Sequence, residues 1–197
     1  ALRVRTIANL GAYLTQLGPH SPTNNLGTLA NTYTTPAFDI EVTGIFTNTN
    51  STGPYRGAGR PEAAYVIERV IDSAAREMGI DRVEIRRRNL IPESAMPYQT
   101  GLLFKYDCGQ FEKNMDDALR MSEFNGFETR RSEARSHGKL RGIGIANAIE
   151  QSAGGPQETA QIRFDPSGGV TLLMGTHNHG QGHETIFRQM LSDKLGL

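Results

Sequence analysis

The chain has 197 residues, with 21 Lys and Arg against 21 Asp and Glu, so its formal net charge is zero. This balance argues against a dedicated nucleic-acid binder, which needs a basic surface. A single cysteine, Cys108, excludes an internal disulfide framework and is typical of a reducing compartment. No run approaches the roughly 18 apolar residues of a membrane span, and no signal peptide is visible at Ala1, so we expect a cytoplasmic protein.

The N-terminal stretch is predicted to contain two strands separated by a loop. Apolar residues alternate along residues 2–14 and again from Phe38 to Phe46, which favours strands. Residues 17–31 between them are polar and contain Gly, Pro and Asn, so we expect an irregular loop there. A turn-rich patch, Asn48–Pro54, then leads into the segment Tyr55–Glu62.

Three helices are expected next. Pro61 suits the first turn of the first helix, and Gly79 ends it after apolar residues at helical spacing. Asp81 and Glu84 form a capping box for a short helix through about Leu90, whose arginine run 86–88 is interpreted as a solvated face. The third helix is marked by apolar side chains at helical spacing, namely Phe111, Met115 and Ala118.

The pattern changes in the last third of the chain. Residues 127–139 are rich in Arg, Glu and Ser, so we expect an exposed helix or linker and place a domain boundary there. Isoleucines at 143, 145 and 149 predict a strand. Residues 160–175 predict a β-hairpin around the turn Asp165–Gly169, and a helix is expected to begin near His183.

The segment Met174–Thr185, MGTHNHGQGHET, is the most informative one, because it joins a predicted strand to a predicted helix. A glycine-rich turn before a helix N-terminus presents free backbone N–H groups that suit an anion such as phosphate. His177, His179 and His183 could instead be metal ligands. Such sites normally include Cys or acidic partners, and only Glu184 lies nearby, so histidines that hydrogen-bond the loop backbone are the favoured interpretation.

The centre of this segment is Gly180-Gln181-Gly182. Two glycines let the backbone approach a ligand closely, and the amide between them offers one acceptor and two donors. Together they suit a flat polar heterocycle with a phosphate tail, although the tripeptide alone is a weak signal.

A second glycine-rich loop precedes a helix at Tyr55–Glu62, YRGAGRPE, and adds Arg56 and Arg60. The fixed fork of donors on arginine suits phosphate or oxyanion groups. An isolated loop of this kind is as well explained by a tight turn with surface ion pairs. Two such helix-opening loops in one chain favour a shared ligand.

These motifs resemble those of a known family. PYRGAGRPE looks like the signature loop of the large, molybdenum-binding subunits of the xanthine dehydrogenase/aldehyde oxidase/carbon monoxide dehydrogenase (molybdenum hydroxylase) family. GTHNHGQGHET looks like the second pterin-contacting loop of that family. Collinear similarity continues through RRRNLIP and LRGIGIA, so the resemblance covers essentially all 197 residues.

The resemblance implies an α+β fold of mixed sheets with helices. Residues 1–130 would be the C-terminal part of the first molybdopterin-binding domain and residues 131–197 the N-terminal part of the second. It also implies a molybdopterin cofactor carrying molybdenum, in bacteria often as the cytosine dinucleotide. The partners would be an FAD-binding medium subunit and a [2Fe–2S] small subunit, and the whole bacterial cytoplasmic enzyme would hydroxylate an aldehyde or N-heterocycle with water as oxygen source.

The resemblance also assigns residues, one by one. His177 and His179 match no ligand position of the family, and no side chain of this chain is expected to bind the metal. The expected cofactor-binding residues are Gly180, Gln181, Gly182, His183 and Arg56. The expected substrate-side loop consists of Arg56, Gly57 and Ala58.

Two departures bear on the reaction. Carbon monoxide dehydrogenases carry a copper-holding cysteine where Gly57 stands, which argues against CO oxidation. Xanthine and aldehyde enzymes tend to carry an aromatic residue where Ala58 stands, which packs on a flat substrate. Because Ala58 lacks this ring, the sequence does not indicate which substrate is bound. The alternatives are a carbon monoxide dehydrogenase homologue that acts on CO and a non-catalytic, stand-alone interaction domain.

The chain is expected to be an internal piece of a longer polypeptide, because neither Ala1 nor Leu197 belongs to a tail or a cap. The family's catalytic glutamate and its upstream cofactor motif match nothing in the sequence, so no catalytic residue is assigned. We therefore expect the isolated chain to be inactive and free of cofactor. We expect self-association to cover its exposed apolar surface.

Overall fold

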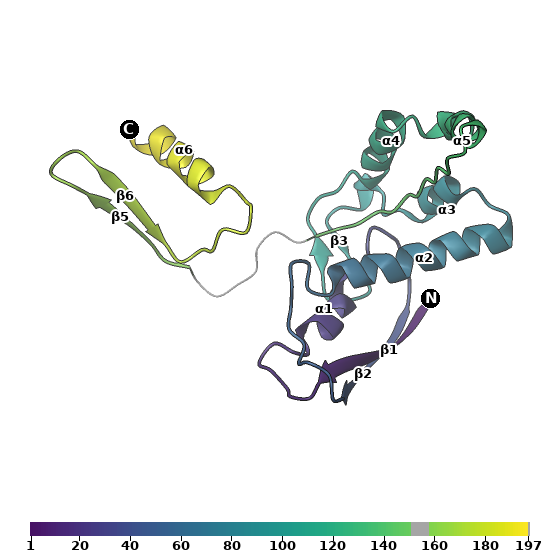
Figure 1. Cartoon of the computed structure of the whole chain (residues 1–197), viewed down its shortest axis with the longest axis horizontal. Helices are drawn as coiled ribbons and strands as arrows, with labels where there is room; N and C mark the ends of the chain where they lie inside the picture. The colour runs from purple at the N-terminus through teal and green to yellow at the C-terminus, as the bar shows by residue number, and fades with distance from the viewer. Residues whose placement is uncertain (151–157, 197) are drawn as a thin grey trace. The chain divides into compact units, whose positions relative to one another are not determined.

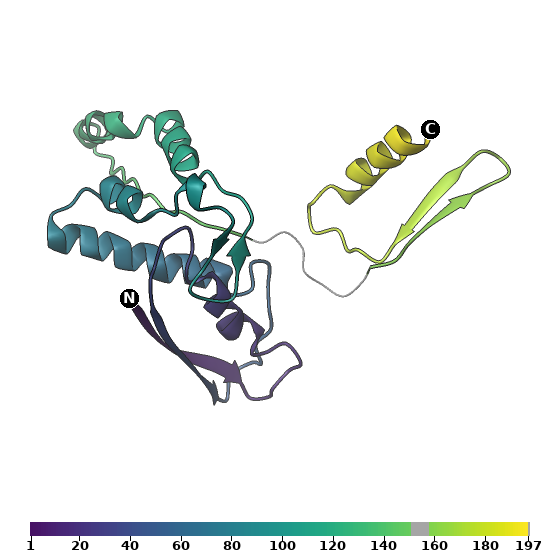
Figure 2. The ribbon, with the colours of Figure 1, turned by 180° about the vertical axis from the view of Figure 1, so that it is seen from behind.

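The computed structural model describes residues 1–150 and 158–196, and the chain divides into two compact units, Ala1–Glu150 and Gln151–Leu197. Helices occur in both units, together with one parallel and two antiparallel pairs of strands (Figures 1 and 2). This confirms the expected α+β class. The boundary expected near residue 130 concerns the domains of a parent subunit and stays a prediction. None of the described helices is long and apolar enough to cross a membrane.

The first unit is built on two parallel strands, β1 (Leu2–Gly11) and β2 (Phe38–Phe46). Both strands were predicted, but the loop expected between them was wrong, because α1 (His20–Thr28) forms there. Parallel strands need a crossover connection, usually helical. The weak helix preference of this polar segment is overridden by packing, since the chain directly after α1 is buried at Leu29 and Ala30.

The next two helices begin and end where the sequence placed them. In α2 (Arg60–Met78), Pro61 occupies the first turn, and Gly79 ends the helix in a left-handed conformation with φ 65°. In α3 (Arg82–Asn89), the Asp81 carboxylate accepts from the backbone N–H groups of Val83 and Glu84. Helix α2 packs against α1 and α3, as both views show (Figures 1 and 2).

The core of the first unit lies where β1, α2 and α4 meet. Helix α4 (Phe111–Met121) was predicted, and its Met115 is buried in this core. The buried members lie far apart in the sequence, namely Leu2, Leu29, Tyr33, Ala63, Ile67, Leu90 and Met115.

Short elements fill the rest of the first unit. The chain forms the 3-10 turns η1 (Glu93–Ala95) and η2 (Phe124–Gly126), and the small hairpin of β3 (Tyr98–Gln99) with β4 (Lys105–Tyr106). Helix α5 (Phe127–Ser136) confirms the expected exposed helix, because only Phe127 at its start is buried.

The segment 139–150, called the strap below, was expected to contain a strand, and this expectation was wrong. Its side chains alternate between partly buried and exposed, as the isoleucine spacing indicated. However, no described strand pairs with it, and its carbonyl groups accept hydrogen bonds from side chains instead. The alternating isoleucines therefore indicated an extended backbone correctly, but they could not indicate which groups hydrogen-bond to it.

The described part of the second unit, residues 158–196, contains a hairpin and one helix. Strand β5 (Ala160–Phe164) pairs antiparallel with β6 (Val170–Met174), and α6 (His183–Leu195) follows the glycine-rich loop. Both the hairpin and the helix were predicted. Leu197, expected in or after this helix, lies outside the described residues. Within residues 158–196 no side chain is buried, so this unit has no core of its own there.

Candidate functional site

The first glycine-rich loop, Tyr55–Gly59, is called the signature loop below. It holds three successive residues with positive φ, namely Gly57 (96°), Ala58 (42°) and Gly59 (97°). Its turns are closed by the N–H of Ala58, which donates to the Tyr55 carbonyl at 2.7 Å, and by the N–H of Arg60, which donates to Gly57 at 3.0 Å. A left-handed conformation costs a residue such as Ala58 about 1–2 kcal/mol. Backbone strain of this kind persists only where the surroundings hold it, and it gathers at functional sites.

Neighbouring residues hold the signature loop in this shape. Asn24 of α1 donates its amide to the Ala58 carbonyl at 3.1 Å. A Cβ on Gly57 would lie 2.6 Å from the Pro61 ring, so this position requires glycine on steric grounds as well. The sequence interpretation missed Asn24, because the loop expected at residues 17–31 gave no reason to single it out.

The signature loop presents backbone donors at the start of α2. In the described parts of the chain, the N–H groups of Gly57 and Gly59 have no hydrogen-bond partner. The first turn of any helix also leaves N–H groups without an intrahelical partner. Such a group of donors, at the positive end of a helix macrodipole, suits an anionic or polar ligand.

A hollow of about 530 Å³ lies beside the signature loop. This volume falls within the range of small-molecule sites. Apolar and small residues line much of it, and Tyr55, Arg56 and Glu62 add polar groups to the lining. The other lining residues are Thr6, Ala8, Asn9, Gly18, Ser21, Pro22, Thr52, Gly53, Ala58, Pro61 and Val66. The structure thus places Arg56 and Ala58 of the predicted substrate-side loop on one concave surface.

The second glycine-rich loop, Thr176–Gly182, is called the GQG loop below. Gly180 and Gly182 have φ of 97° and 77°, and a Cβ on either would meet nothing within 4 Å. Their backbones therefore face open space. Gly182 precedes α6 without a side-chain cap, so the first-turn N–H groups of α6 are not satisfied by a capping side chain.

Gln181 uses its amide in a way that the sequence did not reveal. Its carbonyl oxygen accepts a short hydrogen bond from the backbone N–H of His179. The N–H of Gly180 donates to the Asn178 side chain at 3.1 Å, which tightens the same turn. Because the acceptor of Gln181 is engaged within the loop, its NH₂ group is the part that can serve a ligand as a donor.

The three histidines of this segment do not converge on one point. The rings of His177 and His179 lie 4.4 Å apart between centroids, and the ring of His183 packs on Phe187 at 5.1 Å. A ring nitrogen of His179 lies 3.3 Å from the His177 carbonyl, in line with the favoured interpretation of backbone hydrogen bonding. Among the described residues, no group of three His, Cys, Asp or Glu is placed to hold a metal ion.

His183 has a buried polar atom of interest. Its Nδ1 is inaccessible to solvent and has no hydrogen-bond partner in the described part of the chain. His183, Asn178 and Arg188 line a hollow of about 460 Å³ between β6 and α6. A buried polar atom without a partner costs free energy, so a ligand that satisfies it would be favoured.

Cys108 lies outside both loops. It is exposed, and a hydrogen bond to Asp107 raises the pKa of its thiol. A raised pKa keeps the thiol protonated and less nucleophilic.

The first unit also contains a buried polar cluster, and the sequence interpretation was wrong about its central residue, Arg86. Arg86, assigned to a solvated helix face, is fully buried. Its guanidinium lies 2.8 Å from the Glu68 carboxylate and 2.9 Å from that of Asp72. Burial alone would lower the pKa of Arg86, but the charge and hydrogen bond of Glu68 raise it overall. The pKa of Tyr33 is raised by burial and by its hydrogen bond to Glu68.

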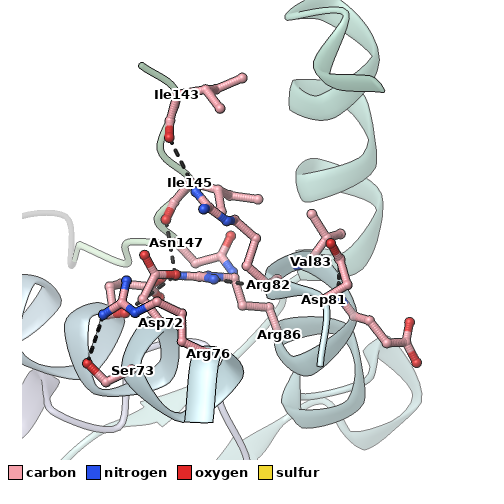
Figure 3. Close-up of polar contacts among 12 residues, drawn as sticks. Asp72, Ser73, Arg76, Asp81, Arg82, Val83, Arg86, Ile143, Ile145 and Asn147 are labelled. Carbon is pink, nitrogen blue, oxygen red and sulfur yellow. Dashed lines mark hydrogen bonds and ion pairs between the residues drawn. The ribbon is translucent and has the colours of Figure 1, made fainter. Parts of the chain in front are cut away.

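Side chains of α3 donate hydrogen bonds to backbone carbonyls of the strap (Figure 3). Arg82 donates to the Ile143 carbonyl at 3.3 Å, and Arg86 donates to the Ile145 carbonyl at 3.1 Å. Asn31 donates to the carbonyl of Asn147 at 2.8 Å. The strap is thus fixed at every second residue by side chains rather than by a neighbouring strand.

The strap ends at the signature loop. A carboxylate oxygen of Glu150 lies 2.7 Å from Nε of Arg60, the first residue of α2. The two groups form an ion pair without the alignment of a hydrogen bond, since the buried Arg60 Nε has no hydrogen-bond partner. The Arg60 side chain is 17% exposed and that of Glu150 is 56% exposed.

Comparison with protein families finds two matches along the chain. The model described as "Molybdopterin cofactor-binding domain" matches residues 1–90, and a second model of the same description matches residues 117–197. The signature loop falls in the first match and the GQG loop in the second.

Individual relatives agree with these matches. The 6-hydroxypseudooxynicotine dehydrogenase complex subunit gamma of Paenarthrobacter nicotinovorans is 31% identical over 96% of this chain and 24% of its own length. The solved structure of Cu,Mo-CO dehydrogenase in its CO-reduced state is 30% identical, with a TM-score of 0.82 over 100% of this chain and 27% of that one. Quinoline 2-oxidoreductase from Pseudomonas putida 86 is 29% identical, with a TM-score of 0.85 over 98% and 26%. The chain therefore spans about a quarter of the length of these relatives.

Proposed function

This chain belongs to the molybdopterin-binding large subunits of the carbon monoxide dehydrogenase/xanthine dehydrogenase family, and on that premise we propose that it is a fragment of a molybdenum hydroxylase. The whole enzyme hydroxylates an aldehyde or N-heterocycle, with water as oxygen source. The observation that carries this proposal is the pair of glycine-rich loops with positive φ at helix N-termini, one in each match to the molybdopterin-binding domain.

The GQG loop fits a molybdopterin. Its glycine backbones are open to close approach, the NH₂ group of Gln181 and the first-turn N–H groups of α6 are donors, and the buried Nδ1 of His183 lacks a partner among the described residues. A pterin with a phosphate tail presents ring acceptors and anionic oxygens that match this set. When bound, the cofactor supplies the redox chemistry of the hydroxylation.

The roles of the chain's own residues follow from these contacts. Gln181 donates its NH₂ group to the pterin while its carbonyl stays bound to the His179 backbone. The N-terminus of α6 binds an anionic oxygen of the cofactor through its backbone N–H groups. Arg56 lines the 530 Å³ hollow, and in this proposal its guanidinium contacts the cofactor or a polar group of the substrate. We propose the cytosine dinucleotide form of the cofactor, by analogy with the bacterial members of the family.

The substrate side is the signature loop. Gly57 and Ala58 are small, and the adjoining hollow is lined largely by apolar and small side chains. Such a surface can contact the face of a substrate ring. It does not fix the ring by stacking, because residue 58 is alanine and not an aromatic residue. A flat N-heterocycle is the substrate class that we favour, and the similarity to quinoline 2-oxidoreductase supports it.

Oxidation of CO is the second candidate. It is favoured by the similarity to Cu,Mo-CO dehydrogenase over the whole length of this chain. Gly57, however, offers no side chain to hold copper at the position where carbon monoxide dehydrogenases carry cysteine. We therefore rank CO oxidation below hydroxylation of a heterocycle or aldehyde.

The proposed assembly follows the relatives, whose names describe them as large chains or subunits of complexes. We propose that the parent subunit works with an FAD-binding medium subunit and a [2Fe–2S] small subunit in the bacterial cytoplasm. Co-purification of the parent subunit with two smaller chains that carry FAD and iron would support this assembly.

The decisive experiment uses the whole parent subunit with its partner subunits. Quinoline, nicotine, xanthine, benzaldehyde and CO are offered in ¹⁸O-labelled water with an artificial electron acceptor. We expect ¹⁸O in the hydroxylated product of a heterocycle or aldehyde. Oxidation of CO alone would favour the second candidate, and a subunit without molybdenum that oxidises nothing would leave only a non-catalytic interaction domain.

A further inference from the structure

The signature loop depends on contacts from outside itself. Ala58, which lies between two glycines of positive φ, is strained by its own positive φ, and two backbone hydrogen bonds close the turns of the loop. The second of these bonds ends on Arg60, which therefore belongs both to the loop and to the first turn of α2. Whatever fixes the Arg60 side chain thus also fixes the end of the loop.

Glu150 is placed to do this. The strap that carries it is held at Ile143, Ile145 and Asn147 by donors from α3 and from the segment after α1. A strap fixed in this way brings the carboxylate to the guanidinium of Arg60 at a reproducible position. Because the Nε of Arg60 is buried, a missing counter-charge would leave a charged group partly desolvated and unpaired.

The position of Arg60 adds a second effect. Arg60 is the first residue of α2, so the carboxylate of Glu150 lies near the positive end of the helix macrodipole. A negative charge there favours the helical conformation of the first turn. The ion pair and the helix-dipole effect both act where the signature loop joins α2, at Arg60. This position is about 90 residues before Glu150 in the sequence.

We propose that Glu150 is a positioning residue that holds the signature loop in its strained shape through Arg60. The role of that loop at the substrate rests on the proposed function, whereas the effect of Glu150 on the loop's order does not. Neutralising Glu150 releases the Arg60 side chain toward solvent and loosens the turn from Tyr55 to Gly59.

The first test measures the loop directly in the 197-residue chain by limited proteolysis with trypsin. Arg56 is exposed within the loop, so the Arg56–Gly57 bond reports its order, whereas the Arg60–Pro61 bond resists trypsin because proline follows. We expect Glu150→Gln to speed this cleavage several-fold relative to cleavage in the exposed helix α5. Glu150→Asp keeps the negative charge, so its cleavage at Arg56 should be as slow as in wild type. The control Glu133→Gln in α5 should leave the rate of cleavage at Arg56 unchanged.

A double variant isolates the ion pair. Arg60→Gln should also speed cleavage at Arg56, and adding Glu150→Gln to it should cause no further increase, because the partner is already gone. Additive effects of the two substitutions, or equal cleavage rates in Glu150→Gln and wild type, would overturn the proposal. Glu150 is exposed enough that its substitution leaves the fold intact, which thermal unfolding of each variant checks.

The second test uses the whole subunit with its partner subunits and quinoline as the substrate. We expect Glu150→Gln to raise KM several-fold with a smaller change in kcat, at unchanged molybdenum content, and Glu150→Asp to reverse the change. Faster cleavage at Arg56 with unchanged KM would contradict the role of the loop in the proposed function but keep the ion pair's effect on the loop. Unchanged cleavage would contradict the proposal whatever the kinetics.

Discussion

At the scale of single residues, the backbone conformation of the two loops explains their glycines. Gly57 has a positive φ and would place a Cβ against the Pro61 ring, whereas Gly180 and Gly182 have positive φ with open space in front. Gly57 is therefore required by the conformation and packing of the signature loop. Gly180 and Gly182 are required by their conformation, and their open surroundings also let a ligand approach the backbone.

Gly57→Ala should destabilise the 197-residue chain by about 1–2 kcal/mol, from the left-handed conformation, and more if the Pro61 ring cannot shift. Urea unfolding followed by circular dichroism measures the change. Gly53→Ala is the matched control, because a Cβ there meets nothing within 4 Å and no positive φ is involved. Equal stability of the two variants would show that the loop adjusts without strain.

Gln181→Ala in the whole subunit should lower its cofactor content, because it removes an amide donor worth roughly 1–3 kcal/mol when the partner is left buried and unpaired. Molybdenum analysis together with fluorescence of the oxidised pterin measures the occupancy. Gln189→Ala on the exposed surface of α6 is the control. Equal occupancy in both variants would count against the role assigned to Gln181.

At the scale of elements, the strap and the buried Arg86 cluster join segments that no local pattern connects. The cluster places the Arg86 guanidinium between two carboxylates, and the same guanidinium donates to the carbonyl of Ile145 in the strap as well as to those of Arg82 and Glu68. Buried charges are tolerated when they are paired and hydrogen-bonded in this way. Helix α3, the helix α2 and the strap are therefore coupled through one side chain.

Arg86→Met should cost about 3–5 kcal/mol, because it leaves the carboxylate of Glu68 buried without its partner. Chemical unfolding of the chain measures the loss, and the double variant with Glu68→Gln should recover part of it. Arg88→Met is the control, since its ion pair with Glu84 is exposed and such pairs contribute about 1 kcal/mol or less. A similar loss in the free energy of unfolding for both variants would contradict the stabilising role assigned to the buried Arg86 cluster.

Tyr106 predicts how stability depends on alkaline pH. Burial raises the pKa of Tyr106 from 10.0 to about 12, and its hydroxyl donates to the Asn31 carbonyl at 2.8 Å. The unfolded chain therefore loses the proton first, so the stabilising contribution is complete below pH 10 and declines as pH rises toward 12. Unfolding measured across this range should show a shallower decline in Tyr106→Phe. An identical slope in the variant would contradict the assignment.

At the scale of the whole molecule, the two units differ in how completely they are formed. The first has a core drawn from strands and helices along its length. In the second, the described residues bury no side chain, and Phe164, Ile186 and Met190 stay well exposed. A hairpin and one helix cannot enclose a core without further layers. The proposed parent subunit would supply them.

The isolated 197-residue chain should therefore contain no stoichiometric molybdenum and show no hydroxylase activity. The physical reason is that the proposed cofactor site draws on parts of the subunit beyond the two loops described here. Elemental analysis of the purified chain checks the metal, and sedimentation velocity shows whether its exposed apolar side chains drive self-association. Stoichiometric molybdenum in the chain would refute the fragment interpretation.

The sequence by itself determined the features that depend on neighbours within a few residues. Asp81 caps α3, Gly79 ends α2, and the turn Asp165–Gly169 closes the hairpin, all as predicted. The two glycine-rich loops and the resemblance that they carry were likewise available from the sequence, because such loops are defined by residue types at fixed spacing.

Only the tertiary structure decided what α1, the strap and Arg86 do. The polar segment 17–31 contains α1 because packing within the first unit overrides its weak helix preference, and the strap is not a strand because its carbonyls accept from side chains. The partners in these contacts lie 59 residues apart for Arg86 and Ile145, and 116 apart for Asn31 and Asn147. Alternation and charge runs describe one segment at a time, so they could indicate an extended strap and a charged helix but not that the two bind each other.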